Sequence, residues 1–329
     1  MEAILGIDIG KREFHAALLT EQGERIHSFP NNPAGFTQLG RWLRNRRVDR
    51  VHACLEATGR YGDALALWLH QAGHRVSVVN PAAIKSFAAS ELKRTKTDAV
   101  DAGVIARFCR SHTPPAWMPP DPEIDRLRQL VRRRNQLVRG RQQELNRRQT
   151  PGLHSDMQQS LAFSLAFLEA EIARVEDLIR QCLRDHPELR RNSELLATIP
   201  GIGEFTAALL LGEIPDVHQF GSAKQLAAYA GLTPRHKQSG GRAYGQSRLC
   251  KLGNAQLRRS LFMPTLSAMV HNPILRALAQ RLRAAGKSKM VIVGALMRKL
   301  LHIVYGVLTS GRPFDPSYQS SVRAPATSA

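Results

Sequence analysis

The sequence predicts an α/β domain with a mixed sheet at its N-terminal end and a mainly α-helical remainder. Three apolar, strand-like stretches at 3–10, 14–20 and 24–29 lie close together, as they do in an antiparallel meander. Alternating helix and strand patterns follow them. Helical periodicity dominates after the proline-rich segment 114–122, which is typical of a domain boundary. This order of elements favours an α/β domain joined to helical parts.

The later elements of the first domain alternate in type. Phe36, Leu39 and Leu43 have the spacing of one helix face, and the run VHACLEA has strand character. After the strands of the meander, the expected order is helix 35–44, strand 51–57, helix 61–71, strand 75–80 and a final helix that begins near Asp98.

Two carboxylates lie close together at the start of that final helix. Asp98 and Asp101 are three residues apart, so both point from one helix face, and Thr97 is suited to cap the helix. Two like charges this close repel each other unless a cation or basic neighbours compensate them. The alternative is that the basic residues of 93–96 neutralise an ordinary surface pair.

The composition indicates a polyanionic partner. The chain has 329 residues, with 47 Lys and Arg against 27 Asp and Glu, which gives a formal net charge of +20. Such an excess of positive charge destabilises a compact protein unless an anionic partner offsets it, and nucleic acid is the leading candidate. Arginine outnumbers lysine, and its planar fork suits phosphate and base edges.

Cysteine spacing and hydropathy predict a soluble cytoplasmic protein. The four cysteines are far apart, which suggests neither a zinc site nor a disulfide framework. The most apolar late segment, 291–308, is interrupted by Arg298, Lys299 and His302, which argues against a membrane span. No basic stretch followed by a long apolar one opens the sequence, so we expect no signal peptide.

Four acids in local context resemble the active site of a ribonuclease-H-like domain of the Holliday-junction-resolvase type. These are Asp8 in GIDIGK, Glu56 in LEATGRYG, and Asp98 with Asp101 in KTDAVDA. The resemblance implies that they hold a divalent metal, Mg²⁺ or Mn²⁺, for phosphoryl transfer, since hard cations take oxygen ligands. Taken singly, Asp8 could be a turn residue at a strand end and Glu56 a residue at a helix entry.

Beyond the boundary, two long helices are expected. The first covers 124–149 and carries nine arginines between Arg126 and Arg148, with Glu144 as the only acid in that interval. After a break at 150–152, apolar residues recur with spacings of four and three, as in a coiled-coil seam: Leu161, Leu165, Leu168, Ile172, Val175, Ile179 and Cys182.

The two helices are predicted to form an antiparallel coiled-coil arm, or to pair with another subunit. The arginine-rich face is interpreted as a stripe that follows phosphates, with Arg132, Arg133 and Arg139 as contacts. An ordinary solvated helix surface is the alternative.

The segment LLATIPGIGEFTAALLL resembles a helix-hairpin-helix element. Its glycines, Gly201 and Gly203, would let backbone N–H groups approach a phosphate at a helix N-terminus. A packing hairpin between two core helices is the alternative.

A loop rich in glycine and basic residues follows at 226–253. Ser239 lies in it as a candidate nucleophile, and the basic side chains around it would stabilise a reacting phosphate. Tyr244 is a weaker rival, and an ordinary turn serine is the alternative. The basic residues near Ser239 are Arg235, Lys237, Arg242 and Arg248.

The combination of the four-acid domain with GLTPRHKQSGGR and KLGNAQLRRSL resembles the DEDD-type insertion-sequence transposases, also described as bridge-RNA-guided recombinases. The resemblance implies that Ser239 attacks a DNA phosphate to give a covalent phosphoserine, and that Asp8, Glu56, Asp98 and Asp101 complete the site with metal. It also implies a structured non-coding guide RNA, donor and target DNA, and a tetramer that shares sites between subunits.

The domains expected on this basis are a ribonuclease-H-like domain at 1–115, an arginine-rich coiled-coil arm at 116–187, a C-terminal transposase domain at 188–316 and a disordered tail at 317–329. Two other functions stay open. One is a metal-dependent nuclease of the Holliday-junction type, in which water attacks the phosphate. The other is a non-catalytic nucleic-acid-binding protein.

Overall fold

The computed structural model describes residues 2–57, 59–91, 98–235, 238–239, 242–243 and 248–317, without the side chains of residues 99, 235, 238, 239, 242, 243 and 248. The chain divides into two compact units, Met1–Pro119 and Pro120–Ala329. The finer division into four parts stays a prediction. The predicted cap Thr97, the predicted contact Lys237 and the predicted disordered tail after residue 317 lie outside the described residues.

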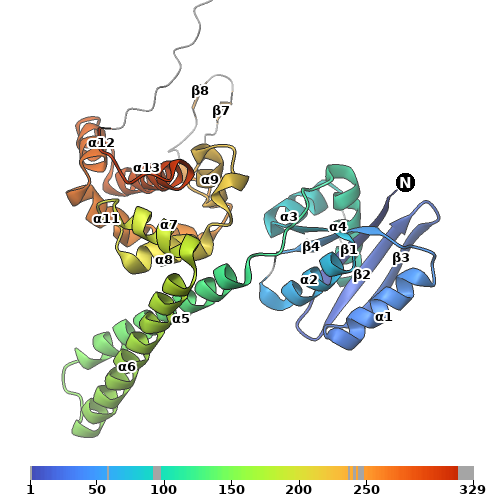
Figure 1. The fold of residues 1–329 in the computed structure, drawn as a ribbon, viewed down its shortest axis with the longest axis horizontal. Coiled ribbons are helices and arrows are strands. Elements are labelled where there is room, and N and C mark those ends of the chain that lie inside the picture. The colour runs from blue at the N-terminus through green and yellow to red at the C-terminus, as the bar shows by residue number, and fades with distance from the viewer. Residues whose placement is uncertain are drawn as a thin grey trace, which may run out of the picture. The chain divides into compact units, whose positions relative to one another are not determined.

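The first unit is built on a mixed five-stranded sheet in the order β3-β2-β1-β4-β5 (Figure 1). β1, β2 and β3 form the predicted antiparallel meander, whereas β4 pairs parallel with β1 and β5 pairs parallel with β4. The mixed sheet is therefore confirmed. The strands are β1 (Ala3–Ile9), β2 (Glu13–Thr20), β3 (Gly23–Pro30), β4 (Val51–Glu56) and β5 (Arg75–Val79).

Helices cover both faces of this sheet. α1 (Pro33–Arg44) and α2 (Asp63–Gln71, preceded by the 3₁₀ turn Arg60–Gly62) pack into the core of one face. α3 (Pro81–Ser90) and α4 (Asp98–His112) pack into the core of the other. Because side chains alternate along a strand, each strand supplies both cores. α3 was not among the helices predicted from the sequence.

The second unit begins with a helical hairpin. α5 (Pro122–Arg148) and α6 (Ser155–Asp185) are joined by a short turn and lie side by side in opposite directions (Figure 1). The apolar seam predicted for the second helix is buried, apart from the partly buried Leu168. An antiparallel helix pair is thus observed, while its finer description as a coiled coil stays a prediction.

The rest of the second unit is mainly helical and surrounds one apolar core. α13 is long and apolar enough to cross a membrane by length and composition, but half of its most apolar window is buried inside this unit. Many of its residues belong to the apolar core of this unit. The remaining elements are α7 (Pro187–Ala197), α8 (Glu204–Glu213), the 3₁₀ turn Val217–Gln219, α9 (Ala223–Tyr229), α10 (Ala255–Ser260), α11 (Phe262–His271), α12 (Pro273–Ala284) and α13 (Lys289–Ser310).

Candidate active site and nucleic-acid interface

Asp8 lies on the face of the sheet that α4 covers. Gly6, two residues earlier on β1, touches α4 so closely that a Cβ there would lie 2.2 Å from the backbone nitrogen of Ala106. The intervening Ile7 belongs to the core on the opposite face. Because alternate residues of a strand share a face, Asp8 points to the same side as Gly6, toward α4.

Glu56 lies on the neighbouring strand with the same orientation. In the parallel ladder Ile7 stands opposite Leu55, so the next residues along the two strands are Asp8 and Glu56. Cys54 packs into the core between the sheet and α4, and Glu56 is two residues further on. The ends of β1 and β4 therefore place these two acids on one face of the sheet.

Asp98 and Asp101 occupy the first turn of α4, as predicted. The helix buries Ala102 and Ile105 against the sheet. Positions three, four and seven residues apart share a helix face, so the two acids extend that buried face toward its N-terminal end. Asp98 is exposed and Asp101 is half-buried.

The pKa of Asp8 responds to its burial and to the charges of Asp98 and Asp101. Burial raises the pKa of Asp8, and the negative charges of Asp98 and Asp101 raise it further. His15, its cross-strand partner on β2, and a hydrogen bond from the backbone of Ile9 act in the opposite direction. Within the described part of the chain, however, no group of three or more His, Cys, Asp and Glu side chains has the arrangement of a metal site.

An ion-pair network that the sequence did not reveal fixes α4. Arg107 donates to both carboxylate oxygens of Glu91 at 2.9 and 3.0 Å, and its third nitrogen contacts Glu24 at 3.3 Å. These acids lie just after α3 and on β3, respectively. The network holds α4, and with it the two acids of its first turn, against two other elements of the unit. Glu91 and Glu24 are 16 and 83 residues away from Arg107 in the sequence, so no local pattern could indicate these ion pairs.

Ser239 lies in a hairpin of short strands. β7 (Gln238–Ser239) pairs antiparallel with β8 (Arg242–Ala243), so that Ser239 stands opposite Arg242. Nearer the base, β6 (Pro234–Arg235) pairs with β9 (Arg248–Leu249). The prediction of a loop over 226–253 is wrong at its start, because residues 226–229 belong to α9, and the predicted basic residues Arg235, Arg242 and Arg248 lie in the short paired strands.

The turn between α7 and α8 contains the two predicted phosphate-binding glycines, which differ in their surroundings. Gly201 has a φ of +100°, and a Cβ there would lie 2.5 Å from the Cβ of Ala268 on α11. Gly203 is the residue before α8, and nothing lies within 4 Å of the position of its Cβ. Gly201 is therefore a packing position, whereas Gly203 faces open space. The helix-hairpin-helix description stays a prediction.

Comparisons with known proteins agree over most of the chain. Family models match residues 5–150, with the description "Transposase", and residues 193–280, with the description "Transposase IS116/IS110/IS902 family". A pilin gene-inverting protein of Moraxella lacunata is 37% identical over 314 residues, which cover 94% of this chain and 97% of that protein. The chain belongs to the IS110 transposase family.

Two further similarities are more distant. The transposase for insertion sequence element IS1328 of Yersinia enterocolitica is 25% identical over 348 residues and matches 95% of this chain and 98% of its own length. Thermus thermophilus RuvC, solved in complex with a Holliday junction substrate, is 14% identical, covers 34% of this chain and 96% of its own, and has a TM-score of 0.27. As an IS110-family member, the protein is a DNA transposase or recombinase enzyme, and its substrate is DNA.

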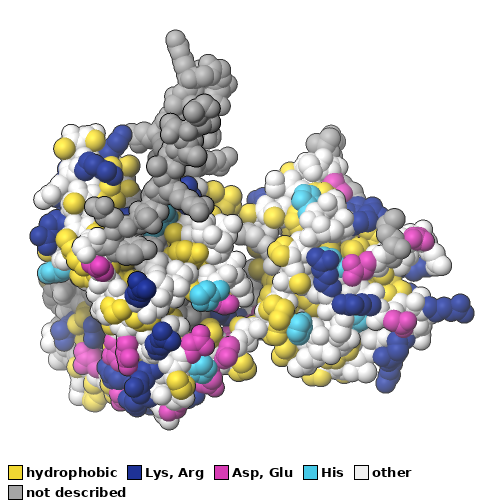
Figure 2. Space-filling view, turned by 45° about the horizontal axis from the view of Figure 1, so that its top comes forward, with side chains coloured by type: hydrophobic (Ala, Val, Ile, Leu, Met, Phe, Trp, Pro, Cys, Tyr) yellow, Lys and Arg dark blue, Asp and Glu magenta, His cyan; other side chains and the backbone are white. Residues whose placement is uncertain are grey.

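On α5 of this transposase, fewer arginines are available to bind a phosphate than the sequence suggests. Five of the nine arginines of α5 form ion pairs with carboxylates: Arg126, Arg128, Arg132, Arg134 and Arg147. Figure 2 likewise shows basic and acidic side chains side by side over the second unit.

The three arginines predicted to bind nucleic acid fall into two groups. Arg132 is engaged by Glu213, whose side chain is only 1% exposed. Arg133 and Arg139 are exposed, so among the three they are the better placed to meet a phosphate.

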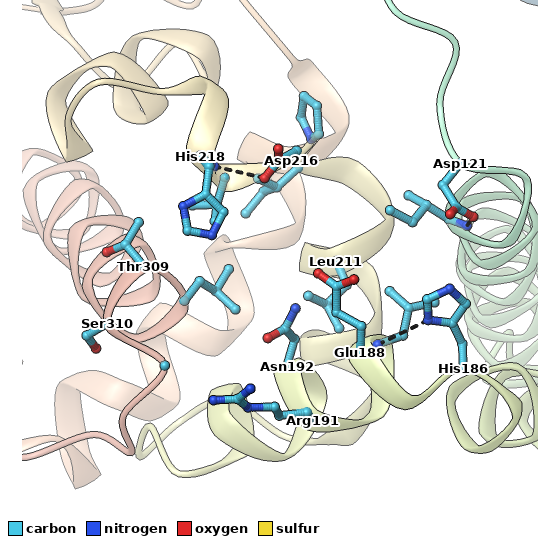
Figure 3. Close-up of a pocket in the computed structure, with 17 residues that line it drawn as sticks. Asp121, His186, Glu188, Arg191, Asn192, Leu211, Asp216, His218, Thr309 and Ser310 are labelled. Atoms are coloured by element: carbon cyan, nitrogen blue, oxygen red, sulfur yellow. Dashed lines mark hydrogen bonds between the residues drawn. The ribbon is translucent and has the colours of Figure 1, made fainter.

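A groove of about 630 Å³ opens elsewhere in the second unit, between the starts of α5 and α7 and the end of α13 (Figure 3). Leu211 and Ile214 line it together with three acids and several basic or neutral polar groups: Asp121, Glu188, Asp216, Arg191, His186 and His218. None of the predicted site residues lines this groove.

Proposed function

We propose that this transposase cuts and rejoins DNA through a covalent phosphoserine at Ser239, with the assistance of a divalent metal held by the four acids. In the reaction, the serine oxygen forms a bond to phosphorus while one bridging phosphorus–oxygen bond breaks. A second DNA end then displaces the serine, so the bond energy is conserved and no net hydrolysis occurs. Donor and target DNA are the substrates.

The observation that carries this proposal is the convergence of Asp8 with Asp98 and Asp101, which come from a strand and a helix 90 residues apart. Burial raises the pKa of Asp8 and the charges of the two helix acids raise it further, while Glu56 ends the adjacent parallel strand on the same face. We propose on this basis, together with the strand order, that the first unit is a ribonuclease-H-like domain of the resolvase type.

The donor set fits Mg²⁺ or Mn²⁺. All four side chains supply oxygen atoms, which hard divalent cations prefer, and a cation would offset the repulsion that raises the pKa of Asp8. Bound there, the ion would stabilise negative charge on the phosphate oxygens. Since the described carboxylates do not form a closed set of ligands, we expect the site to tighten on binding the ion.

The Ser239 hairpin supports the nucleophilic role through its basic strands. Arg242 is the direct backbone partner of Ser239, and Arg235 and Arg248 pair near the base. Guanidinium groups near the serine hydroxyl would favour its ionised form and stabilise a pentacoordinate phosphate. Lys237 belongs to the same proposal from its position in the sequence.

The remaining parts of the proposal concern partners. Arg133 and Arg139 on the exposed face of α5, together with the backbone at Gly203, are proposed to contact nucleic-acid phosphates. The family resemblance supports a structured non-coding guide RNA, assembly as a tetramer and location in the bacterial cytoplasm. Arg132 is proposed to contribute in another way, described in the next subsection.

Denaturing electrophoresis tests the chemistry. The protein, with its co-purifying RNA and Mg²⁺, is incubated with end-labelled junction DNA, and we expect a labelled protein–DNA band that survives denaturant. Ser239→Ala and EDTA should each abolish it, while both should leave DNA binding intact. Ser288→Ala is the matched control, because Ser288 is an exposed serine of the same unit whose side chain caps no backbone group of α13.

The metal acids are tested in the same assay. Asp98→Asn and Asp101→Asn should each abolish the band, and full turnover in both would remove the metal assignment. Cleaved DNA without a shifted band, still produced by Ser239→Ala, would instead identify a nuclease in which water attacks the phosphate.

A further inference from the structure

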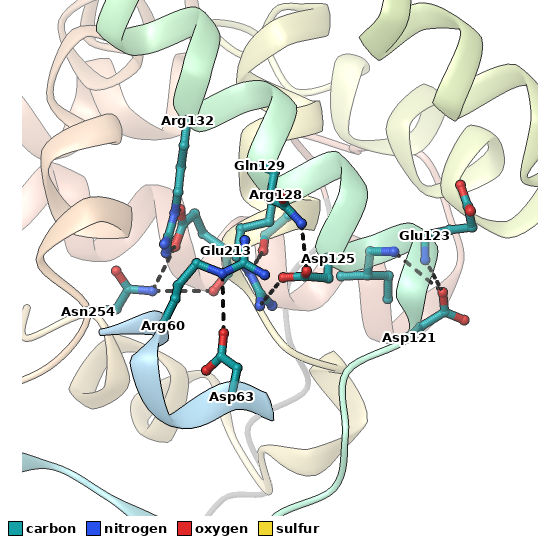
Figure 4. Close-up of polar contacts among 12 residues, drawn as sticks. Arg60, Asp63, Asp121, Glu123, Asp125, Arg128, Gln129, Arg132, Glu213 and Asn254 are labelled. Carbon is teal, nitrogen blue, oxygen red and sulfur yellow. Dashed lines mark hydrogen bonds and ion pairs between the residues drawn. The ribbon is translucent and has the colours of Figure 1, made fainter. Parts of the chain in front are cut away.

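A buried carboxylate joins the arm to the rest of the second unit. Glu213 ends α8, and its side chain is 1% exposed. Arg132 of α5 donates to its two oxygens at 2.5 and 2.8 Å, and Asn254 donates its Nδ2 to it at 3.1 Å (Figure 4). A charge removed from water in this way depends on its partners. The three side chains therefore form one junction between elements far apart in the sequence.

Asn254 uses all of its polar groups at this point. Its Oδ1 accepts from the backbone of Leu257 and caps α10, while its Nδ2 reaches Glu213. Its own backbone N–H donates to the carbonyl of Tyr229 at 2.7 Å. Asn254 lies five residues after Leu249, where the last strand of the Ser239 hairpin ends, so this end of the hairpin is connected to α8, and through Glu213 to α5.

The other end of the hairpin is fixed to the same place. Lys251 N–H donates to Gly231 O at 3.1 Å and Cys250 N–H donates to Thr233 O at 2.8 Å, which closes the two limbs on each other. Gly253 has a φ of +134°, and a Cβ there would lie 2.2 Å from the carbonyl oxygen of Tyr229. The base of the hairpin thus admits one close-packed arrangement, set by its neighbours.

We propose that Arg132, Glu213 and Asn254 form a positioning junction that sets the Ser239 hairpin relative to the arm. The inference rests on the proposed role of Ser239. Arg133, the neighbour of Arg132, is on the exposed face of α5 that is proposed to meet nucleic acid. A shift of α5 on binding nucleic acid would therefore reach the base of the hairpin through one ion pair and one hydrogen bond.

Two substitutions each remove one interaction of the junction and keep the other structural role of the substituted residue. Glu213→Gln keeps the shape of the side chain but removes its charge. Asn254→Ser keeps an N-cap oxygen for α10 and loses the Nδ2 donor. Arg134→Gln is the matched control, since Arg134 forms a similar, partly buried ion pair with Glu176 that joins α5 to α6 and does not reach the hairpin.

The first measurement is the rate of covalent protein–DNA formation in a single turnover at saturating DNA, beside the Kd for DNA. We expect Glu213→Gln and Asn254→Ser to slow the rate by roughly 10- to 100-fold, because small misplacements of a reacting group have effects of this size. The Kd should stay within about twofold, since neither residue is proposed to contact DNA. Arg134→Gln should react at nearly the wild-type rate, although it too loses an ion pair.

The second measurement does not require the chemistry to occur. Amide hydrogen exchange at Cys250, Lys251 and Asn254 should be faster in Glu213→Gln and Asn254→Ser than in the wild type, and unchanged in Arg134→Gln. Unchanged exchange in both junction variants would overturn the junction, as would wild-type reaction rates. If the wild type forms no covalent species, the role of Ser239 fails, and the exchange data still decide whether the junction holds the hairpin.

Discussion

Arg107→Met should destabilise the first unit by about 2–3 kcal/mol. Arg107 binds Glu91 through two hydrogen bonds of 2.9 and 3.0 Å, with side chains that are 19% and 21% exposed. Hydrogen bonds to charged groups contribute about 1.5–3 kcal/mol. The longer contact with Glu24, which is 32% exposed, adds about 0.5 kcal/mol, as for a surface ion pair. The substitution also leaves two neighbouring carboxylates without their shared cation.

Tryptophan fluorescence measures this effect in the full-length chain. All three tryptophans, Trp42, Trp68 and Trp117, lie in the first unit and pack against its core, so their emission follows the unfolding of that unit. With a urea dependence of about 2 kcal/mol per M, the midpoint should fall by about 1 M.

Arg110→Met is the matched control for this experiment. Arg110 is three residues further along the same helix and is exposed, so its substitution should change stability by less than about 0.5 kcal/mol. Equal midpoints for the two variants would refute the view that the Arg107 network fixes α4.

Three other predictions follow from the geometry. Because the pKa of Asp8 is raised in the folded state, ionisation of Asp8 lowers the free energy of unfolding as the pH rises through that pKa. In EDTA at pH 7, urea unfolding should therefore show that Asp8→Asn is more stable than the wild type. At acidic pH, where the wild-type Asp8 is protonated, the two proteins should be equally stable. Gly6→Ala should cost about 3 kcal/mol or more, measured by tryptophan fluorescence, since its Cβ would lie 2.2 Å from the backbone of α4. Arg133→Gln with Arg139→Gln should reduce the slope of log K against log salt by about 2 in DNA-binding titrations, whereas Arg134→Gln should leave it unchanged.

The elements that position the acids could be predicted because their signals are local. Alternation along β1 and β4 and the three-residue spacing of Asp98 and Asp101 each fix which way a side chain points. The strand order follows from the short connections of the meander and from the helices that link the parallel strands. What the spacing could not supply was the docking of α4. This docking depends on Gly6, which has no side chain and so lets α4 approach the sheet, and on Arg107, whose ion-pair partners come from distant segments of the sequence.

Two features of the backbone were predicted incompletely for a different reason. α3 packs Ala83, Ile84, Phe87 and Ala88 against the core, but only Ile84 is fully buried, and this short apolar stripe was overlooked in the sequence. A second signal is at its start, where Asn80 accepts from the backbone of Ala82 and Pro81 occupies the first turn. The region 226–253 was predicted as a long polar loop, yet its start belongs to α9 and its short strands pair with one another; period-two patterning needs longer strands to be visible.

The arginine-rich arm shows why the sign of a local charge run is a weak guide to its partner. Counting acids between Arg126 and Arg148 finds only Glu144, but the helix is also reached by Glu123 and Asp125 at its start, by Glu176 from α6 and by Glu213 from α8. The partners at 176 and 213 become neighbours only on folding. A phosphate stripe therefore cannot be measured by the number of arginines. The useful measure is the number of arginines that stay exposed once the others have paired with acids of the protein itself. For this reason Arg133 and Arg139, and not Arg132, are the residues whose loss should change the salt dependence of DNA binding.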